Sequence, residues 1–179
     1  MIKTKGNSAL YSSVIISPIN SVNETIQYFK PSFVISILGK SDGYAFPSLS
    51  IKNHLCLNFD DVGYTSEFGR APDLNDISML IDFSKNWNRK GELLIHCKAG
   101  TSRSPAAAII ALWATARGTP ENDIFNLLKL KSYYRPNITM LRLADNILKT
   151  DSKLADVTNN FQKTNIVNSM GAARLVITD

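Results

Sequence analysis

One segment of this chain carries most of the information about its architecture. It reads Leu93-Leu94-Ile95-His96-Cys97-Lys98-Ala99-Gly100-Thr101-Ser102-Arg103-Ser104-Pro105. The three apolar residues at its start are typical of a short buried strand, and Ser104-Pro105 matches the N-cap and first position of a helix. The segment therefore predicts a strand, a loop and a helix start, with the loop at the carboxyl end of the strand.

The segments on either side of it alternate in the same way. Short apolar or β-branched runs predict strands at 14–17, 33–38 and 54–59. Apolar spacing and capping residues predict helices at 21–30, 73–90, 104–118, 119–131 and 137–150. Strands that alternate with helices predict an α/β fold with a mostly parallel central sheet flanked by helices, in which ligands bind at the carboxyl ends of the strands.

The composition is that of an ordinary globular protein. Its 179 residues are 44% hydrophobic and 20% charged, which fits one domain and excludes wholesale disorder. The longest apolar stretches, such as 106–116, are shorter than the roughly 18 residues that span a bilayer. Two cysteines are too few for a disulfide framework or a zinc site. We therefore expect a soluble, cytoplasmic protein that needs no metal and no cofactor.

The loop places a cysteine directly before a helix N-terminus. Free backbone N–H groups and the positive end of the helix dipole favour an anion there, either the thiolate itself or a bound phosphate. Gly100 allows the backbone to turn amides inward, and the planar guanidinium of Arg103 can hold two phosphoryl oxygens. Ser104 adds a hydroxyl near the sulfur. The pattern indicates a nucleophilic Cys97 facing a phosphate.

The nine residues His96-Cys97-x-x-Gly100-x-x-Arg103-Ser104 resemble the signature of the cysteine-dependent protein tyrosine phosphatases. The short chain and the serine after the arginine are similar to the dual-specificity-like branch. The order of elements from about 33 to 150, with Arg135-Pro136-Asn137 before the last helix, also resembles that family. The resemblance implies a phosphatase domain at 1–150 and a C-terminal extension at 151–179, helical or partly disordered.

The resemblance implies a role for each position of the loop. Cys97 would be the nucleophile that forms a phosphocysteine intermediate, and Ser104 would stabilise the departing thiolate. His96 would influence the ionisation of the cysteine through the hydrogen bonds of the loop. The phosphoryl group would be bound by the loop amides and the guanidinium, which belong to Lys98, Ala99, Gly100, Thr101, Ser102 and Arg103.

A general acid must protonate the leaving oxygen. In the family this acid is an aspartate on a loop after the strand that precedes the long helix, and here that strand ends in Phe59-Asp60-Asp61. We select Asp61, because the alternating apolar residues before it match the family's pattern, and Asp60 stays the second choice. One carboxylate of the pair is expected to orient the loop while the other points at the substrate.

Other residues near these segments receive simpler interpretations. Cys56 is expected to pack in the core, the usual place of a free cysteine. His54 is interpreted as a polar residue at a strand edge, and Arg135 as either a structural pair or a second phosphate contact. Tyr64 and Phe68 are candidates for the wall of the pocket beside the acid.

The cysteine loop and its resemblance to the tyrosine phosphatases together imply a phosphomonoester hydrolase for phosphotyrosine, and for phosphoserine or phosphothreonine. A phosphorylated protein is the expected partner, and a monomer the expected state. One alternative is an enzyme of the same fold for phosphoinositides or RNA 5′-phosphates, suggested by Lys98 and by six basic against two acidic residues in 98–135. The other alternative is a phosphate-binding adaptor with weak or no turnover.

Overall fold

The structure, a computed structural model, describes residues 12–116, 120–162 and 172–177. Its strands are β1 (Ser12–Pro18), β2 (Phe33–Ile37), β3 (Asn53–Leu57), β4 (Glu92–Cys97) and β5 (Ala173–Ile177). Its α-helices are α1 (Val22–Phe29), α2 (Leu74–Trp87), α3 (Arg103–Ala114), α4 (Glu121–Leu130), α5 (Ile138–Leu148) and α6 (Lys153–Gln162). Two short 3-10 helices are η1 (Ile19–Ser21) and η2 (Lys40–Asp42).

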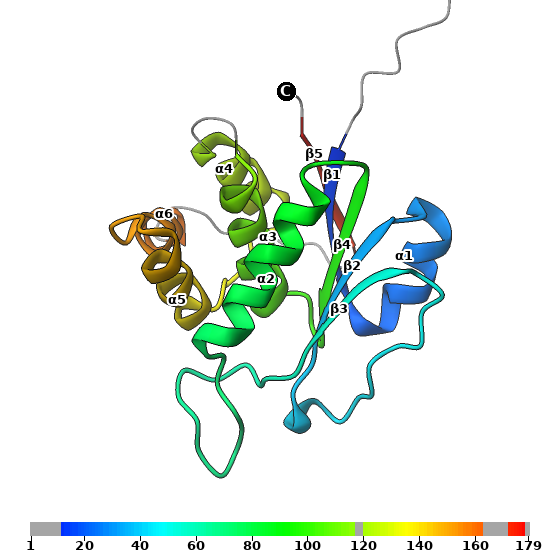
Figure 1. Cartoon of the computed structure of the whole chain (residues 1–179), viewed down its shortest axis with the longest axis horizontal. Coiled ribbons are helices and arrows are strands. Elements are labelled where there is room, and N and C mark those ends of the chain that lie inside the picture. The colour runs from blue at the N-terminus through cyan, green and yellow to red at the C-terminus, as the bar shows by residue number, and fades with distance from the viewer. Residues whose placement is uncertain (1–11, 117–119, 163–171, 178–179) are drawn as a thin grey trace, which may run out of the picture.

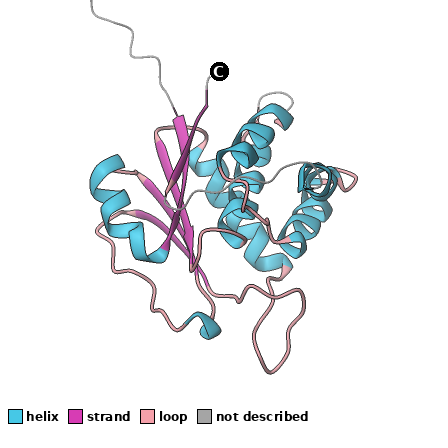
Figure 2. Cartoon of the chain, turned by 180° about the vertical axis from the view of Figure 1, so that it is seen from behind, coloured by secondary structure: helices cyan, strands magenta, loops and turns pink. Residues whose placement is uncertain are grey.

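The five strands form one sheet in the order β3-β2-β4-β1-β5. The first four strands in this order are parallel, and β5 pairs antiparallel with β1. The sheet stands between α1 on one face and α2 to α6 on the other (Figures 1 and 2). This arrangement confirms the predicted α/β fold with a mostly parallel central sheet.

Two hydrophobic cores hold the helices on the sheet. The larger core lies between the sheet and the helices of the crowded face, and α3 supplies its centre because every side chain from Ala106 to Leu112 is buried. A helix that is apolar all round is stable only when neighbours cover it on all sides. The smaller core, under α1, is built from Ile15, Val22, Val34 and Leu94.

The segment after residue 150 contributes two elements to the fold. Helix α6 begins where the Asp145 carboxylate accepts hydrogen bonds from the amides of Leu154 and Ala155, a cap supplied from α5. Strand β5 then forms the far edge of the sheet, in register with β1 from Ser12 to Ile16. The expected C-terminal extension thus forms the helix α6 and supplies the fifth strand of the same sheet.

Three local expectations differ from the structure or fall outside it. Helix α3 begins at Arg103, so Ser104 lies inside the first turn and is not the N-cap. Cys56 is exposed, and its predicted core position is wrong, because β3 is the edge strand of the sheet that the described residues form. The expected helix boundary at Gly118 and Thr119 lies outside the described residues. Among the described residues, no helix has the length and apolar character needed to cross a membrane.

Candidate active site

The candidate site lies at the carboxyl ends of three neighbouring parallel strands. The loops that follow β2, β3 and β4 all leave the sheet at its lower edge in Figure 1. They carry η2, the long connection 58–73 and the cysteine loop 98–102. Parallel strands bring their carboxyl ends together, and ligands of such sheets bind there.

Cys97 ends β4 and is buried below the cysteine loop. Its Sγ accepts a hydrogen bond from the amide of Gly100, with N and S 3.2 Å apart. Gly100 has a φ of +70°, and a Cβ there would lie 2.9 Å from the backbone nitrogen of Pro18. Glycine is therefore required at this position both by its conformation and by the close approach of β1.

The carbonyl groups of the cysteine loop point to the segments around it. The Lys98 carbonyl accepts from the Ile19 amide at 3.1 Å. The Thr101 carbonyl accepts from the Arg135 amide at 2.8 Å, and the Ser102 carbonyl accepts from the Asn137 amide at 3.2 Å. In the described part of the chain, the amides of Ala99, Thr101 and Ser102 donate to no backbone carbonyl. The loop is thus fixed from outside through its oxygens, and its N–H groups stay available to an anion.

The Arg103 side chain is almost fully buried and its orientation is set by η2. Its two terminal nitrogens donate to the Asp42 carboxylate at 2.7 and 2.9 Å, and one of them also donates to the carbonyl of Phe59 at 2.9 Å. Burial would raise the pKa of Asp42, but the hydrogen bonds from Arg103 and from the Gly39 amide hold it below its ordinary value. Both ends of this pair are consequently charged at neutral pH.

Buried polar atoms without a partner gather at this loop. In the described part of the chain there are four such side-chain atoms, and three belong to residues that flank the loop: Nδ1 of His96 at the end of β4, and Nε of Arg103 and Oγ of Ser104 at the start of α3. Native structures pair nearly all buried polar groups, so a cluster of unpaired donors marks a place where a polar ligand is received. An anion at the loop would accept from the Arg103 Nε.

Asp61 lies over the cysteine loop. Its Oδ1 accepts hydrogen bonds from Ser102 Oγ and from Asn137 Nδ2, each at 2.8 Å. Asn137 is also the N-cap of α5, where its own side-chain oxygen accepts from the Met140 amide at 3.1 Å. A single side chain therefore starts α5 and holds the Asp61 carboxylate beside the loop.

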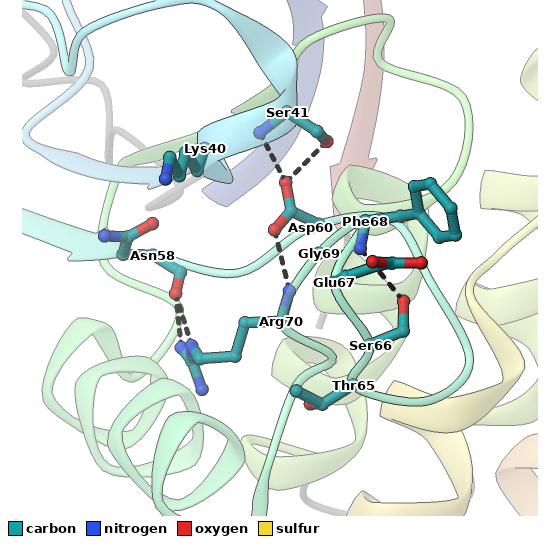
Figure 3. A pocket seen from close by; sticks show the side chains of 10 residues that line it. All are labelled: Lys40, Ser41, Asn58, Asp60, Thr65, Ser66, Glu67, Phe68, Gly69 and Arg70. Atoms are coloured by element: carbon teal, nitrogen blue, oxygen red, sulfur yellow. Dashed lines mark hydrogen bonds between the residues drawn. The ribbon is translucent and has the colours of Figure 1, made fainter.

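Asp60 has a different environment although it is the adjacent residue. It is 2% exposed, and its carboxylate accepts from the Ser41 amide and hydroxyl and from the Arg70 amide (Figure 3). Burial would raise the pKa of Asp60, but these hydrogen bonds bring it below its ordinary value. A Cβ at Gly39 or at Gly69 would collide with this carboxylate. Asp60 therefore fastens η2 to the base of the 58–73 connection.

A cavity of about 500 Å³ opens beside Asp60 (Figure 3). Its wall is formed by Lys40, Ser41, Asn58, Asp60, Thr65, Ser66, Glu67, Phe68, Gly69 and Arg70. On the same connection Tyr64 and Phe68 are 77% and 78% exposed. A pair of backbone hydrogen bonds between Ser66 and Gly69 closes a tight turn at its tip. Phe68 thus lines the cavity, whereas Tyr64 does not.

The structure therefore brings Asp61 and all the residues predicted for the loop to one place. Arg135 lies next to it, and one terminal nitrogen of its guanidinium donates to the carbonyls of Ser132 and Tyr134. His96 is fully buried under the loop, where burial and then the nearby His54 ring lower the pKa of His96 to about 4.

Two residues of the site were not found from the sequence. Asp42 orients Arg103 from a turn 61 positions earlier in the chain, and its only sequence signal is a short polar group after a strand. Asn137 was noted only as a residue before the last helix, although an N-cap next to the loop was a usable signal.

No protein-family profile matches this sequence, and no curated protein matches it either. Solved structures do match. DUSP15 is 14% identical with a TM-score of 0.58, covering 85% of this chain and 92% of that chain. PTPMT1 in complex with PI(5)P is 16% identical with a TM-score of 0.55, covering 86% and 97%. The human tyrosine phosphatase-like serine/threonine/tyrosine-interacting protein is 18% identical with a TM-score of 0.56, covering 77% and 92%.

These similarities confirm the fold predicted from the sequence. The chain has the tyrosine phosphatase fold in the form shared by dual-specificity phosphatase structures, and it spans most of the length of each. At such identities the likeness concerns the fold, and function has to be argued from the site.

Proposed function

We propose that this chain is a phosphomonoester hydrolase that uses a phosphocysteine intermediate and acts on phosphotyrosine, and on phosphoserine or phosphothreonine. The cluster of buried unpaired polar atoms around Cys97 carries the proposal. A loop with free amides, a fixed guanidinium and an overlying carboxylate matches the charge and the proton needs of a phosphate monoester. The proposal includes a monomeric, cytoplasmic enzyme without a metal or cofactor.

In the first step the Cys97 thiolate attacks phosphorus and forms a P–S bond while the P–O bond to the leaving group breaks. Asp61, in its carboxylic acid form, gives its proton to the leaving oxygen. Arg103 contributes its Nε and one remaining N–H of a terminal nitrogen, since Asp42 and the Phe59 carbonyl accept from three of its five N–H groups. The loop amides and these N–H groups stabilise the negative charge on the equatorial oxygens.

In the second step water attacks the phosphocysteine. Asp61, now a carboxylate, accepts a proton from the water as its oxygen bonds to phosphorus. The P–S bond breaks and the sulfur leaves as a thiolate, which the Gly100 amide and the Ser104 hydroxyl stabilise. Inorganic phosphate is released, and the enzyme returns to its starting state, with Cys97 as a thiolate and Asp61 carrying the proton that it took from water.

Release of phosphate from para-nitrophenyl phosphate tests the proposal. We expect turnover by the wild-type chain with excess chelator present, loss of turnover in Cys97→Ser, and inhibition by vanadate. Cys56→Ser is the matched control, because it removes the other thiol, which is exposed on the edge strand β3 and outside the cysteine loop. If the wild-type chain binds tungstate but releases no phosphate, the adaptor alternative replaces the enzyme. Turnover that survives Cys97→Ser would contradict the mechanism.

A substrate panel separates the possible phosphate sources. Lys98 is the one lysine of the cysteine loop and is exposed, and a single extra cation is little for a polyanionic headgroup. We therefore expect a higher kcat/KM for phosphopeptides than for phosphoinositide vesicles or 5′-phosphorylated RNA. PTPMT1, which shares the fold, was crystallised with PI(5)P, so phosphoinositides are the main alternative to phosphopeptides in this panel. A preference for lipid or RNA would overturn the substrate assignment.

A further inference from the structure

A polar row crosses the sheet directly beneath the candidate site, on the face that α1 covers. Ser17 of β1, His96 of β4 and Ser36 of β2 lie side by side in register, and none of them has any exposed surface. The neighbouring residues on this face, such as Val34 and Leu94, are apolar. Buried polar groups in a sheet are costly unless they are hydrogen-bonded, so the row needs a reason.

The row contains two histidines joined by one hydroxyl. Ser36 Oγ lies 2.6 Å from His96 Nε2 and 2.7 Å from Nε2 of His54, which is partly exposed on the edge strand β3. A hydroxyl has one proton, so with both bonds made Ser36 donates to one ring and accepts from the other. The tautomers of the two imidazoles are therefore coupled through Ser36.

The surroundings select one of the two arrangements. His54 faces solvent and can expose a bare ring nitrogen there, whereas Nδ1 of His96 is buried without a hydrogen-bond partner. Beside it, the backbone of Cys97 favours a proton on the His96 ring, since it raises the pKa of His96 against the larger, opposite effect of burial. The favoured arrangement runs from His54 N–H to Ser36, and from Ser36 O–H to His96 Nε2, which leaves the His96 proton on Nδ1.

We propose that Ser36 and His54 are positioning residues that fix the tautomer and orientation of the His96 imidazole, and through it the backbone of Cys97. This inference rests on the proposed function for its catalytic meaning, but its geometry is independent of turnover. One peptide bond joins His96 to Cys97, and an imidazole held at its Nε2 cannot rotate under the loop. Cys56 Sγ also lies against the His54 ring, 3.5 Å from its Nε2.

The direct test is the tautomer of His96, measured by long-range ¹⁵N–¹H correlation of the histidine rings. The wild-type chain should give a His96 signal with the proton on Nδ1 and a bare Nε2. Ser36→Ala should change or broaden that signal, and Ser36→Thr, which keeps the hydroxyl, should restore it. Ser17→Ala is the matched control: it removes a buried hydroxyl on the other side of His96, where Ser17 bonds to Pro18 and Thr25.

The second measurement is the rate of Cys97 alkylation by iodoacetamide across pH, followed by peptide mass spectrometry so that Cys56 is counted separately. Ser36→Ala and His54→Leu should slow alkylation of Cys97 about tenfold or more at neutral pH, the order expected when a buried polar group loses its partner. His54→Gln, which keeps a donor, and Ser17→Ala should stay close to wild type.

The two proposals fail separately. An unchanged His96 signal and unchanged Cys97 alkylation in Ser36→Ala would overturn the positioning role, whatever the activity of the chain. A changed signal in a chain that releases no phosphate would keep the positioning role and overturn the hydrolase. Equal losses in Ser36→Ala and Ser17→Ala would mean general destabilisation of the sheet and would also overturn the inference.

Discussion

The cysteine loop and the 58–73 connection face each other at the same edge of the sheet, yet they are held in opposite ways. The cysteine loop is fixed along its length, by β1, by the segment before α5 and by the turn at Gly100. The connection is fixed towards its base, through Asp60, Asp61 and Arg70 and by a hydrogen bond from Thr139 Oγ1 to the Gly63 carbonyl, and its tip carries exposed Tyr64 and Phe68.

The difference follows from the task that we assign to each. Charge stabilisation gains most when the dipoles are in place before the reaction, so a loop that binds phosphate benefits from rigidity. A loop that delivers a proton and meets varied substrates needs only its carboxylate held. The adjacent Asp60 and Asp61 serve these two purposes separately. The Asp60 carboxylate is buried and anchors the connection, whereas the Asp61 carboxylate is exposed over the site.

The largest effect is expected when the planar guanidinium of Arg103, next to the rigid cysteine loop, is replaced. Arg103→Lys should lower kcat/KM about a thousandfold, the loss seen for a preorganised donor to a developing oxyanion. Asp42→Asn should lower it less, because the guanidinium stays while its orientation relaxes. Initial rates and vanadate affinity measure both effects, and Arg103→Lys at wild-type activity would contradict the role of the loop.

Asp61→Asn tests the proposed proton donor, which lies on the 58–73 connection. We expect kcat to fall by about a hundredfold or more with little change in KM, since a positioned acid contributes about 10²–10⁴ in rate. Thermal stability should change little, because the side chain is exposed and asparagine can still accept from Ser102 and Asn137. A larger loss of kcat in Asp60→Asn than in Asp61→Asn would exchange the two assignments.

The burial of His96 beneath the cysteine loop makes the stability of the fold depend on pH. Its pKa is about 4 in the fold against 6.5 in the unfolded chain, so between these values the unfolded state binds more protons. The contribution of His96 to stability is therefore complete above pH 6.5 and is lost, by roughly 3 kcal/mol, as the pH falls to about 4. Denaturant unfolding across this range should show a slope that is absent in His96→Asn.

Asp60→Asn should act on stability more than on chemistry. Asparagine presents one acceptor oxygen where the carboxylate uses two, so a donor from Ser41 or Arg70 is left unpaired at a cost of about 2 kcal/mol. The midpoint of urea unfolding should fall, and kcat should fall by less than in Asp61→Asn. An unchanged midpoint would mean that the base of the connection is not fastened there.

The smallest effect is expected at the tip. Phe68→Ala should raise KM for phosphopeptides a few-fold, about 1 kcal/mol of lost contact, and leave kcat and the hydrolysis of para-nitrophenyl phosphate unchanged. Tyr64→Ala is the matched exposed aromatic that does not line the cavity. If both variants raise KM equally, the cavity has no part in substrate contact.

Local sequence patterns predicted most of the fold for identifiable reasons. The strand at Glu92–Cys97 and the loop after it are encoded by contiguous residues. The helix start predicted at 73 is confirmed, since Asp73 is the N-cap of α2 and its side chain accepts from the Asp76 amide. Edge position is not a local property. The same apolar run therefore gave a correct strand at β3 and a wrong burial for Cys56.

The sequence by itself predicted the strands and helices up to residue 150 and their alternation through short-range periodicity, and nine consecutive residues suggested the chemistry that we propose for the cysteine loop; strand β5 was not predicted. Only the tertiary structure decided which residues meet the loop. Asp42 on Arg103, Asn137 on Asp61 and His54 on Ser36 are contacts between segments distant in sequence. Such pairings depend on strand order and on the closing of loops over one edge, which no local preference encodes.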